Sequence, residues 1–253
     1  LAISTLGQAR RMSRQLLDRA LRDPAPSVRA TAARYLGAVS PSQRAELIRI
    51  ALGDADPQTN IEALQQVTRL PLDEAYCSLL VAAARGGALS VRVVALDALS
   101  RPCPDTRDQL AVLSEVTTSQ AESDLEGWQP RAHALLSLAR LSPEAATTRL
   151  PDFVEARNPS VRAYAARAAR MLDDRTALRT LARDDAPNVQ TAALEGLFSL
   201  EGHGIDDLLI AQFDDGDPQL LMTVSRLLEG SPRREVAASA ALQAFERVSK
   251  AER

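Results

Sequence analysis

The side chains best suited to catalysis are few and far apart in this 253-residue chain. Its two histidines, His133 and His203, are 70 residues apart, whereas catalysis needs acid, base and nucleophile groups that converge on one point. No Gly-rich phosphate-binding motif occurs, and the Gly86-Gly87 pair is too short to form one. We therefore predict no catalytic residues, no enzyme activity in this segment and no cofactor.

An acidic stretch, Asp214–Asp217, has the composition of the start of a calcium-binding loop. Such a loop needs a bidentate Glu at its twelfth position, where this sequence has Ser225. Short carboxylates ahead of a helix accept hydrogen bonds from its free N–H groups, and helix capping explains the stretch better. The pairs Asp173-Asp174 and Asp184-Asp185 follow the same pattern, so we predict no metal site.

The two cysteines, Cys77 and Cys103, lack the spacing of a metal site. A pair of cysteines is too few for a disulfide framework, and we predict buried structural thiols. No run of 18 or more apolar residues occurs, so we expect no membrane-spanning helix. Residues 1–30 show no signal-peptide pattern, and the cytoplasm is the favoured compartment.

Charge is distributed unevenly along the chain. The net charge of −3 argues against a protein that coats nucleic acid, because phosphate binding needs a dense basic face. Residues 1–50 hold nine arginines against three acidic residues, so this part carries +6 and the remaining 203 residues carry −9. The basic end either docks an acidic partner or a second copy of the chain, or is an ordinary solvated surface.

The elements that position these side chains follow from a repeat. An apolar residue, a small residue four places on and an apolar residue eight places on recur seven times. The leading residues are Val28, Thr59, Val91, Pro130, Val161, Val189 and Leu220, at gaps of 31, 32, 39, 31, 28 and 31 residues. Such periods arise when a two-helix unit cannot bury its apolar stripe alone and stacks on neighbouring copies. We therefore predict an all-α repeat array.

Each unit is expected to contain a helix A, a turn rich in Asp, Pro or Gly, and a helix B that carries the repeated phrase. A proline shortly before the leading residue marks the start of several helices B, because its missing N–H costs nothing in a first helical turn. The predicted helices A span 12–22, 42–53, 72–86, 105–118, 144–156, 174–183 and 204–213, the helices B span 26–38, 57–69, 89–100, 128–141, 159–171, 187–199 and 218–229, and a closing helix spans 232–249.

The segment Asp23–Arg29, followed by Ala32, Leu36 and Gly37, resembles the HEAT repeat, especially the short bacterial form found in phycobilisome-lyase-type arrays. Arg157–Arg162 is similar to a second copy, and Pro151 matches the proline that kinks helix A in many HEAT repeats. The resemblance covers nearly the whole chain. It implies a right-handed HEAT-like α-solenoid, a superhelix of antiparallel helix pairs, with about seven and a half repeats in one array over residues 1–253.

The resemblance also carries expectations for particular residues. In the family, an Asp in the turn and an Arg six residues later commonly form a hydrogen-bonded ladder between repeats. Only Asp23 and Arg29 keep both residue types here, so a continuous ladder is not expected. Metal-binding HEAT hydroxylases have His-Glu pairs, and neither histidine is followed by Glu, so a di-iron site is not expected either.

Two irregularities interrupt the array. Residues 1–7 align with the middle of a helix B, so we expect earlier repeats outside this segment, with an exposed apolar end. The gap of 39 residues places an insertion near residues 119–127, directly before Trp128, the only tryptophan. Insertions in solenoids map to surface loops, and Trp128 either anchors a partner or packs the insertion onto the array.

A helical wheel with the repeated phrase turned inward identifies the outward positions of the helices B. In the second turn these positions carry a net charge of +1 over seven helices, which does not make a phosphate track. Apolar residues occur among them and one turn earlier, as in a protein-binding groove. The predicted partner-binding residues are Arg34, Ile61, Val93, Leu136, Arg167, Met222, Arg226 and Trp128.

These features predict a protein-interaction scaffold within a larger protein, with a concave helix-B surface that binds a protein, a peptide or another domain of the same chain. An alternative is the structural arm of a multidomain enzyme whose catalytic domain lies outside this segment, since some bacterial HEAT arrays adjoin such domains. A HEAT-like DNA-binding or DNA-repair protein is a third, less favoured interpretation, and nucleic acid is not the expected partner.

Overall fold

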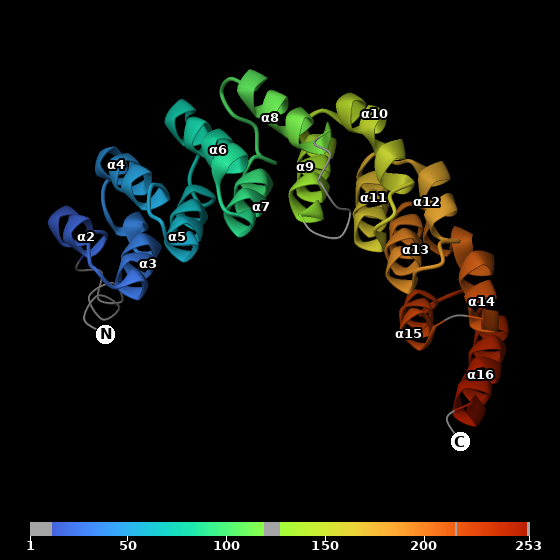
Figure 1. The fold of residues 1–253 in the computed structure, drawn as a ribbon. Coiled ribbons are helices and arrows are strands. Elements are labelled where there is room, and N and C mark those ends of the chain that lie inside the picture. The colour runs from blue at the N-terminus through green and yellow to red at the C-terminus, as the bar shows by residue number, and fades with distance from the viewer. Residues whose placement is uncertain (1–11, 119–126, 216, 252–253) are drawn as a thin grey trace. The chain divides into compact units, whose positions relative to one another are not determined.

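The computed structural model describes residues 12–118, 127–215 and 217–251, and within these ranges it contains helices and no strand (Figure 1). The first helices of the pairs are α2 (Arg14–Ala20), α4 (Pro41–Leu52), α6 (Glu74–Gly86), α8 (Arg107–Thr118), α10 (Pro143–Val154), α12 (Arg175–Leu181) and α14 (Asp206–Asp215). The second helices are α3 (Pro26–Arg34), α5 (Pro57–Val67), α7 (Leu89–Ala98), α9 (Trp128–Leu141), α11 (Pro159–Met171), α13 (Pro187–Glu201) and α15 (Pro218–Leu227), followed by α16 (Arg234–Ala251). We call the first set helices A and the second set helices B, and α16 belongs to neither set.

The predicted helices are confirmed to within two residues at each end, with one exception. The helix predicted for residues 26–38 ends at Arg34 and gives way to a 3₁₀ turn, η1 (Leu36–Ala38). The buried side chain of Arg44 explains this end, because it donates hydrogen bonds to the carbonyls of Leu36, Gly37 and Val39. An arginine from the next helix thus satisfies carbonyls that have no partner within the helix.

Helix starts follow the local chemistry of the turns. Proline occupies the first turn of α3, α5, α11, α13 and α15, as predicted. The carboxylate of Asp56 accepts a hydrogen bond from the Thr59 N–H, and that of Asp217 accepts one from the Gln219 N–H. The capping interpretation of Asp217 is therefore confirmed.

The chain divides into two compact units. Within the described residues, unit 1 consists of residues 12–118 and 127–142 and contains α2 to α9, whereas unit 2 consists of residues 143–215 and 217–251 and contains α10 to α16. In unit 1 the helices B pack side by side in chain order, and α4, α6 and α8 do the same in a second row (Figure 1). In unit 2, α11, α13 and α15 form one row, and α14 and α16 pack together beside it.

The core of each unit is aliphatic, and the repeated phrase supplies much of it. Ala32 and Leu36 in unit 1 are fully buried, as are Ala165 and Ala169 in unit 2. Gly196 in α13 allows the close packing of α12, because a Cβ atom there would lie 2.8 Å from Leu178 Cδ2. The inward register predicted from the repeat is confirmed at these positions.

Among the described residues, no helix is both long enough and apolar enough to cross a membrane.

Candidate functional site

The outward side chains of unit 1 are largely used in contacts between neighbouring helices. Arg34 on α3 donates two hydrogen bonds to Glu62 on α5, at 2.5 and 3.1 Å. These bonds hold the pKa of Glu62 below its ordinary value, although burial acts in the opposite direction. Glu62 lies beside the predicted position Ile61, one residue away from the outward positions of the helical wheel. The guanidinium of Arg34 is therefore engaged in an ion pair with the neighbouring helix α5.

The other predicted positions of unit 1 are only partly accessible. Ile61, Val93 and Leu136 are half-buried. Asp97 on α7 lies 2.6 Å from Nδ1 of His133 on α9, so this histidine links two helices. The predicted apolar positions in unit 1 are thus only partly exposed, and polar contacts between helices lie next to them.

Trp128 begins α9 and is half-buried. Gly127 precedes it with a φ of 82°, a left-handed conformation that glycine adopts without strain. The predicted insertion falls mainly on residues 119–126, which lie outside the described residues, as do residues 1–7. The role of Trp128 as a partner anchor stays a prediction.

Unit 2 has a hollow of about 560 Å³ on the surface of its helices B. Its lining comes from α11, α13 and the first turn of α15 and is mostly polar: Arg167, Arg170, Pro187, Asn188, Thr191, Ala192, Glu195, Gly196, Ser199 and Gln219. Both arginines are exposed, and the guanidinium of Arg167 lies 4.7 Å from the centre of the Tyr164 ring. The predicted residue Arg167 therefore lies in a concave site.

The charges around this hollow are unequal. Glu195 receives a hydrogen bond of 2.6 Å from Arg226 on α15, so its charge is already paired. Arg167 and Arg170 thus leave the hollow with a net positive character. Arg170 was not predicted, because it lies one turn beyond the two outward wheel positions of α11. The predicted residue Arg226 borders the hollow by holding Glu195.

Met222, another predicted residue, is 75% exposed on α15. It does not line the hollow of the helices B but an apolar groove between α15 and α16. The helical wheel predicted correctly that Met222 is exposed, whereas the residues of α16 next to Met222 are evident only from the fold.

Two rungs of a ladder link successive turns, one in each unit. Arg29 donates to both carboxylate oxygens of Asp54 in the next turn, at 2.6 and 2.9 Å, and reaches only the main-chain carbonyl of Asp23. Arg162 does the same with Asp184, at 2.6 and 2.7 Å. Arg29 and Arg162 thus each pair with the Asp of the following turn, because the stacking of repeats brings that turn close to the guanidinium.

The ladder shifts the ionisation of both carboxylates. The hydrogen bond from Arg29 lowers the pKa of Asp54. Burial acts to raise the pKa of Asp184, but hydrogen bonds from Arg162 and from the Ala186 N–H outweigh it and the pKa is lowered. Asp54 and Asp184 are therefore structural carboxylates that remain charged at neutral pH.

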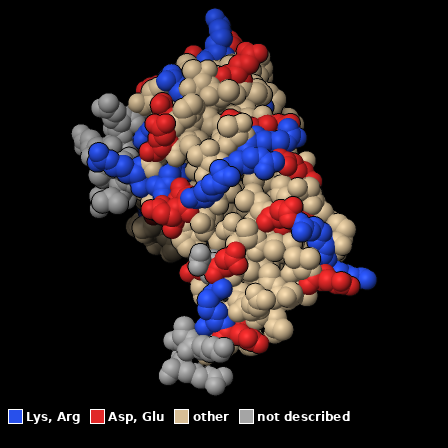
Figure 2. All heavy atoms as spheres, turned by 90° about the vertical axis from the view of Figure 1, so that its right-hand side faces the viewer, with Lys and Arg blue, Asp and Glu red and all other residues tan. Residues whose placement is uncertain are grey.

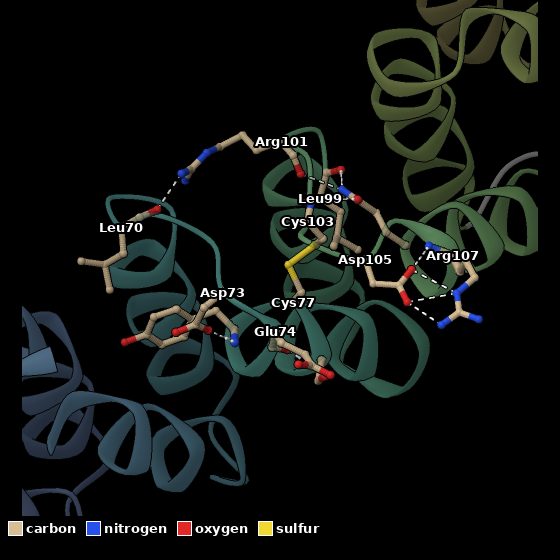
Figure 3. Close-up of a disulfide and its surroundings, with 12 residues drawn as sticks. Leu70, Asp73, Glu74, Cys77, Leu99, Arg101, Cys103, Asp105 and Arg107 are labelled. Carbon is tan, nitrogen blue, oxygen red and sulfur yellow. Dashed lines mark hydrogen bonds and ion pairs between the residues drawn. A yellow bond between two sulfur atoms is a disulfide. The ribbon is translucent and has the colours of Figure 1, made fainter. Parts of the chain in front are cut away.

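Cys77 and Cys103 form a disulfide, with a sulfur–sulfur distance of 2.04 Å (Figure 3). The prediction of free thiols was wrong, although both residues are buried as expected. The bond ties α6 to the loop before α8. That pairing was not apparent in the sequence, because a sequence separation of 26 places the two cysteines in different repeats.

The loop that carries Cys103 is also held by hydrogen bonds. The buried amide of Gln109 accepts from the Cys103 N–H and donates to the carbonyls of Leu99 and Arg101. The Arg101 side chain extends to the carbonyls of Thr68 and Leu70, at 2.7 and 2.6 Å (Figure 3). The disulfide and these bonds together fix the connection between consecutive repeats.

Within the described ranges, no group of three or more His, Cys, Asp or Glu side chains is placed to hold one metal ion. His203 Nδ1 lies 3.0 Å from Asp206, which also accepts a hydrogen bond from Ser231. The face of the molecule in Figure 2 carries basic and acidic side chains next to each other. The described surface thus offers polar and apolar hollows as its candidate binding sites.

Comparisons with known proteins are informative about the fold. No protein-family model and no curated protein matches the chain. The crystal structure of YibA from Escherichia coli, a HEAT-repeat-like protein, is similar in fold, with a TM-score of 0.56 and 15% sequence identity. The match covers 96% of this chain and 96% of that chain. At this identity the similarity supports a helical repeat-like fold and says nothing about activity.

Proposed function

We propose that this chain is a right-handed HEAT-like α-solenoid that serves as a protein-binding module. The alternation of helices A and B within each unit supports the architecture, as does the similarity in fold to YibA. One observation carries the functional part: the hollow on α11, α13 and α15, where Arg167 and Arg170 face a concave polar surface.

The chemistry of this hollow favours an acidic segment of a partner protein. Guanidinium groups form paired hydrogen bonds with carboxylates, and the ring of Tyr164 holds Arg167 in place. Asn188, Thr191 and Gln219 add side chains that can bond to a peptide backbone. Because the carboxylate of Glu195 is paired with Arg226, it competes little for the two arginines.

Affinity capture from a lysate of the source organism tests the proposal. The unmodified chain is compared with the double variant Arg167→Glu/Arg170→Glu. Arg183→Glu serves as a control, because Arg183 is exposed at the end of α12 and does not line the hollow. We expect a protein that the unmodified chain and the control retain, that the double variant loses, and that a Glu-rich peptide displaces. Equal recovery by all three, or no captured protein, contradicts the proposal.

A further inference from the structure

Large hydrophobic side chains are exposed mainly at one place. Among the described residues, five such side chains are exposed, and four of them lie on α15 and α16. They are Met222 at 75%, Phe245 at 69%, Leu242 at 60% and Val236 at 48%. Isolated apolar residues are common on protein surfaces, whereas a cluster of them marks a site of contact.

Three of these side chains surround or flank a groove between the two helices. Met222 and Phe245 line a hollow of about 430 Å³, whose floor includes the buried residues Phe213 and Ala244. Leu242 lies three residues before Phe245, so it extends the same face of α16. The residues that line this hollow are almost all apolar, so it suits a hydrophobic ligand.

A second hollow of about 470 Å³ continues the groove along α16. The two hollows share Phe213, Ser225 and Ala241. Ala237 and Ala238 line the second one, and small side chains allow another backbone to approach closely. The combined groove therefore runs beside α15 from Pro218 to Glu229, with small side chains in its α16 wall.

The packing within unit 2 indicates what fits there. The helix B α13 packs against α12 and α11, and the helix B α15 packs against α14 and α13. Each helix B thus contacts the helix A before it and the preceding helix B. Because α16 packs against α14, it takes the place of a helix A, and the groove has the position of a helix B relative to α15 and α16.

We infer that the groove between α15 and α16 binds an amphipathic α-helix of another protein, with an apolar residue, a small residue and an apolar residue at positions i, i+4 and i+8. This spacing is that of Val189, Ala193 and Leu197, the fully buried face of α13. The bound helix lies parallel to α15, as the helices B of one row do, and contacts Met222 and Phe245.

Charge at the far end of the groove agrees with this orientation. Arg226 and Arg234 line that end beside Glu229, and Arg226 also donates a hydrogen bond to Glu195 on α13. A helix parallel to α15 places its carboxyl end there, where unpaired carbonyl groups carry partial negative charge.

A direct binding measurement tests this inference. The probe is a fluorescent synthetic peptide with the sequence of residues 187–201, and the control peptide has the same residues reordered so that the apolar spacing is lost. We expect saturable binding of the probe to the chain in fluorescence anisotropy, at least tenfold tighter than that of the control. Equal affinity for both peptides, or no binding of the probe, overturns the inference.

Variants locate the binding. Met222→Glu and Phe245→Glu are expected to weaken probe binding at least tenfold, and both side chains are exposed, so the fold should persist in circular dichroism. Val236→Glu is the control, because Val236 is exposed on α16 but lines neither hollow. An equal loss in Val236→Glu overturns the inference. So does sedimentation of the unmodified chain as a dimer that Phe245→Glu dissociates, because the occupant is then a second copy.

The groove shares no lining residue with the hollow of the proposed function, and the two proposals can fail independently. The double variant Arg167→Glu/Arg170→Glu should bind the probe as the unmodified chain does. A loss of probe binding in that variant contradicts the placement of the helix between α15 and α16.

Discussion

Removing the disulfide should destabilise unit 1 by an amount that follows from the loop it closes. Cys77 and Cys103 are 26 residues apart in sequence. In the chain-entropy model, closing a loop of this length in the unfolded state contributes about 3.5 kcal/mol to the free energy of unfolding. We expect the double variant Cys77→Ser/Cys103→Ser to lose about this much, which is a large part of the stability of a domain of this size.

The chain contains a convenient probe for this loss. Trp128, the only tryptophan, belongs to unit 1, so its fluorescence during urea unfolding reports on the unit that holds the disulfide. Far-UV circular dichroism follows both units together, and loss of the disulfide should separate its transition from that of the fluorescence. A reducing agent should lower the midpoint of the unmodified chain to that of the double variant and leave the variant unchanged.

Two results would refute this reasoning. If the double variant and the unmodified chain unfold at the same urea concentration with the same slope, the disulfide does not constrain the unfolded chain. If alkylation and mass spectrometry of the chain purified from its source find two free thiols, the bond does not form in the cell. A formed bond in that experiment places the chain in an oxidising compartment, because disulfides persist there.

Three further predictions concern the ladder and the core. Asp184→Asn should lower the free energy of unfolding by about 1 to 3 kcal/mol, because it weakens a buried charged hydrogen bond. Asp185→Asn, at a side chain that is 93% exposed, should lower it by less than about 1 kcal/mol. Urea unfolding measures both variants, and equal losses contradict the assignment of Asp184 as the structural partner. The lowered pKa of Asp54 stabilises the fold above the ordinary aspartate pKa, so that stability falls as the pH drops below about 4. In Asp54→Asn the urea unfolding midpoint should fall less steeply with pH in this range, and an unchanged pH dependence refutes the prediction. Leu36→Ala should cost about 2 to 5 kcal/mol, because Leu36 is fully buried, and an unchanged thermal midpoint contradicts the register.

The helices could be predicted because their signals are local. A proline at the first turn, an Asp before it and apolar residues at i, i+4 and i+8 act within one helix, and these features lie next to each other in the sequence. Pro159 and Val161, for example, determine both the start and the buried face of α11. The departure at η1 shows the limit of such signals, because Arg44 in the next helix decides how that segment ends.

The candidate binding residues could be predicted only in part. The wheel identified Arg167 as outward, but whether an outward residue is available depends on the neighbouring helix. Arg34 meets Glu62 across the gap between α3 and α5, whereas Arg167 stacks on Tyr164 of its own helix and faces a hollow. The difference arises from side chains on adjacent helices, which the wheel of a single helix does not contain.

The sequence by itself determined the all-helical class, the order of the helices and their buried faces, because periodic burial is a property of each short segment. Only the tertiary structure decided which residues of different repeats meet. Arg29 reaches Asp54, Cys77 bonds to Cys103, and Met222 faces Phe245 across a groove. These pairings depend on the offset and rotation between stacked helices, which follow from the shapes of all the packed side chains together.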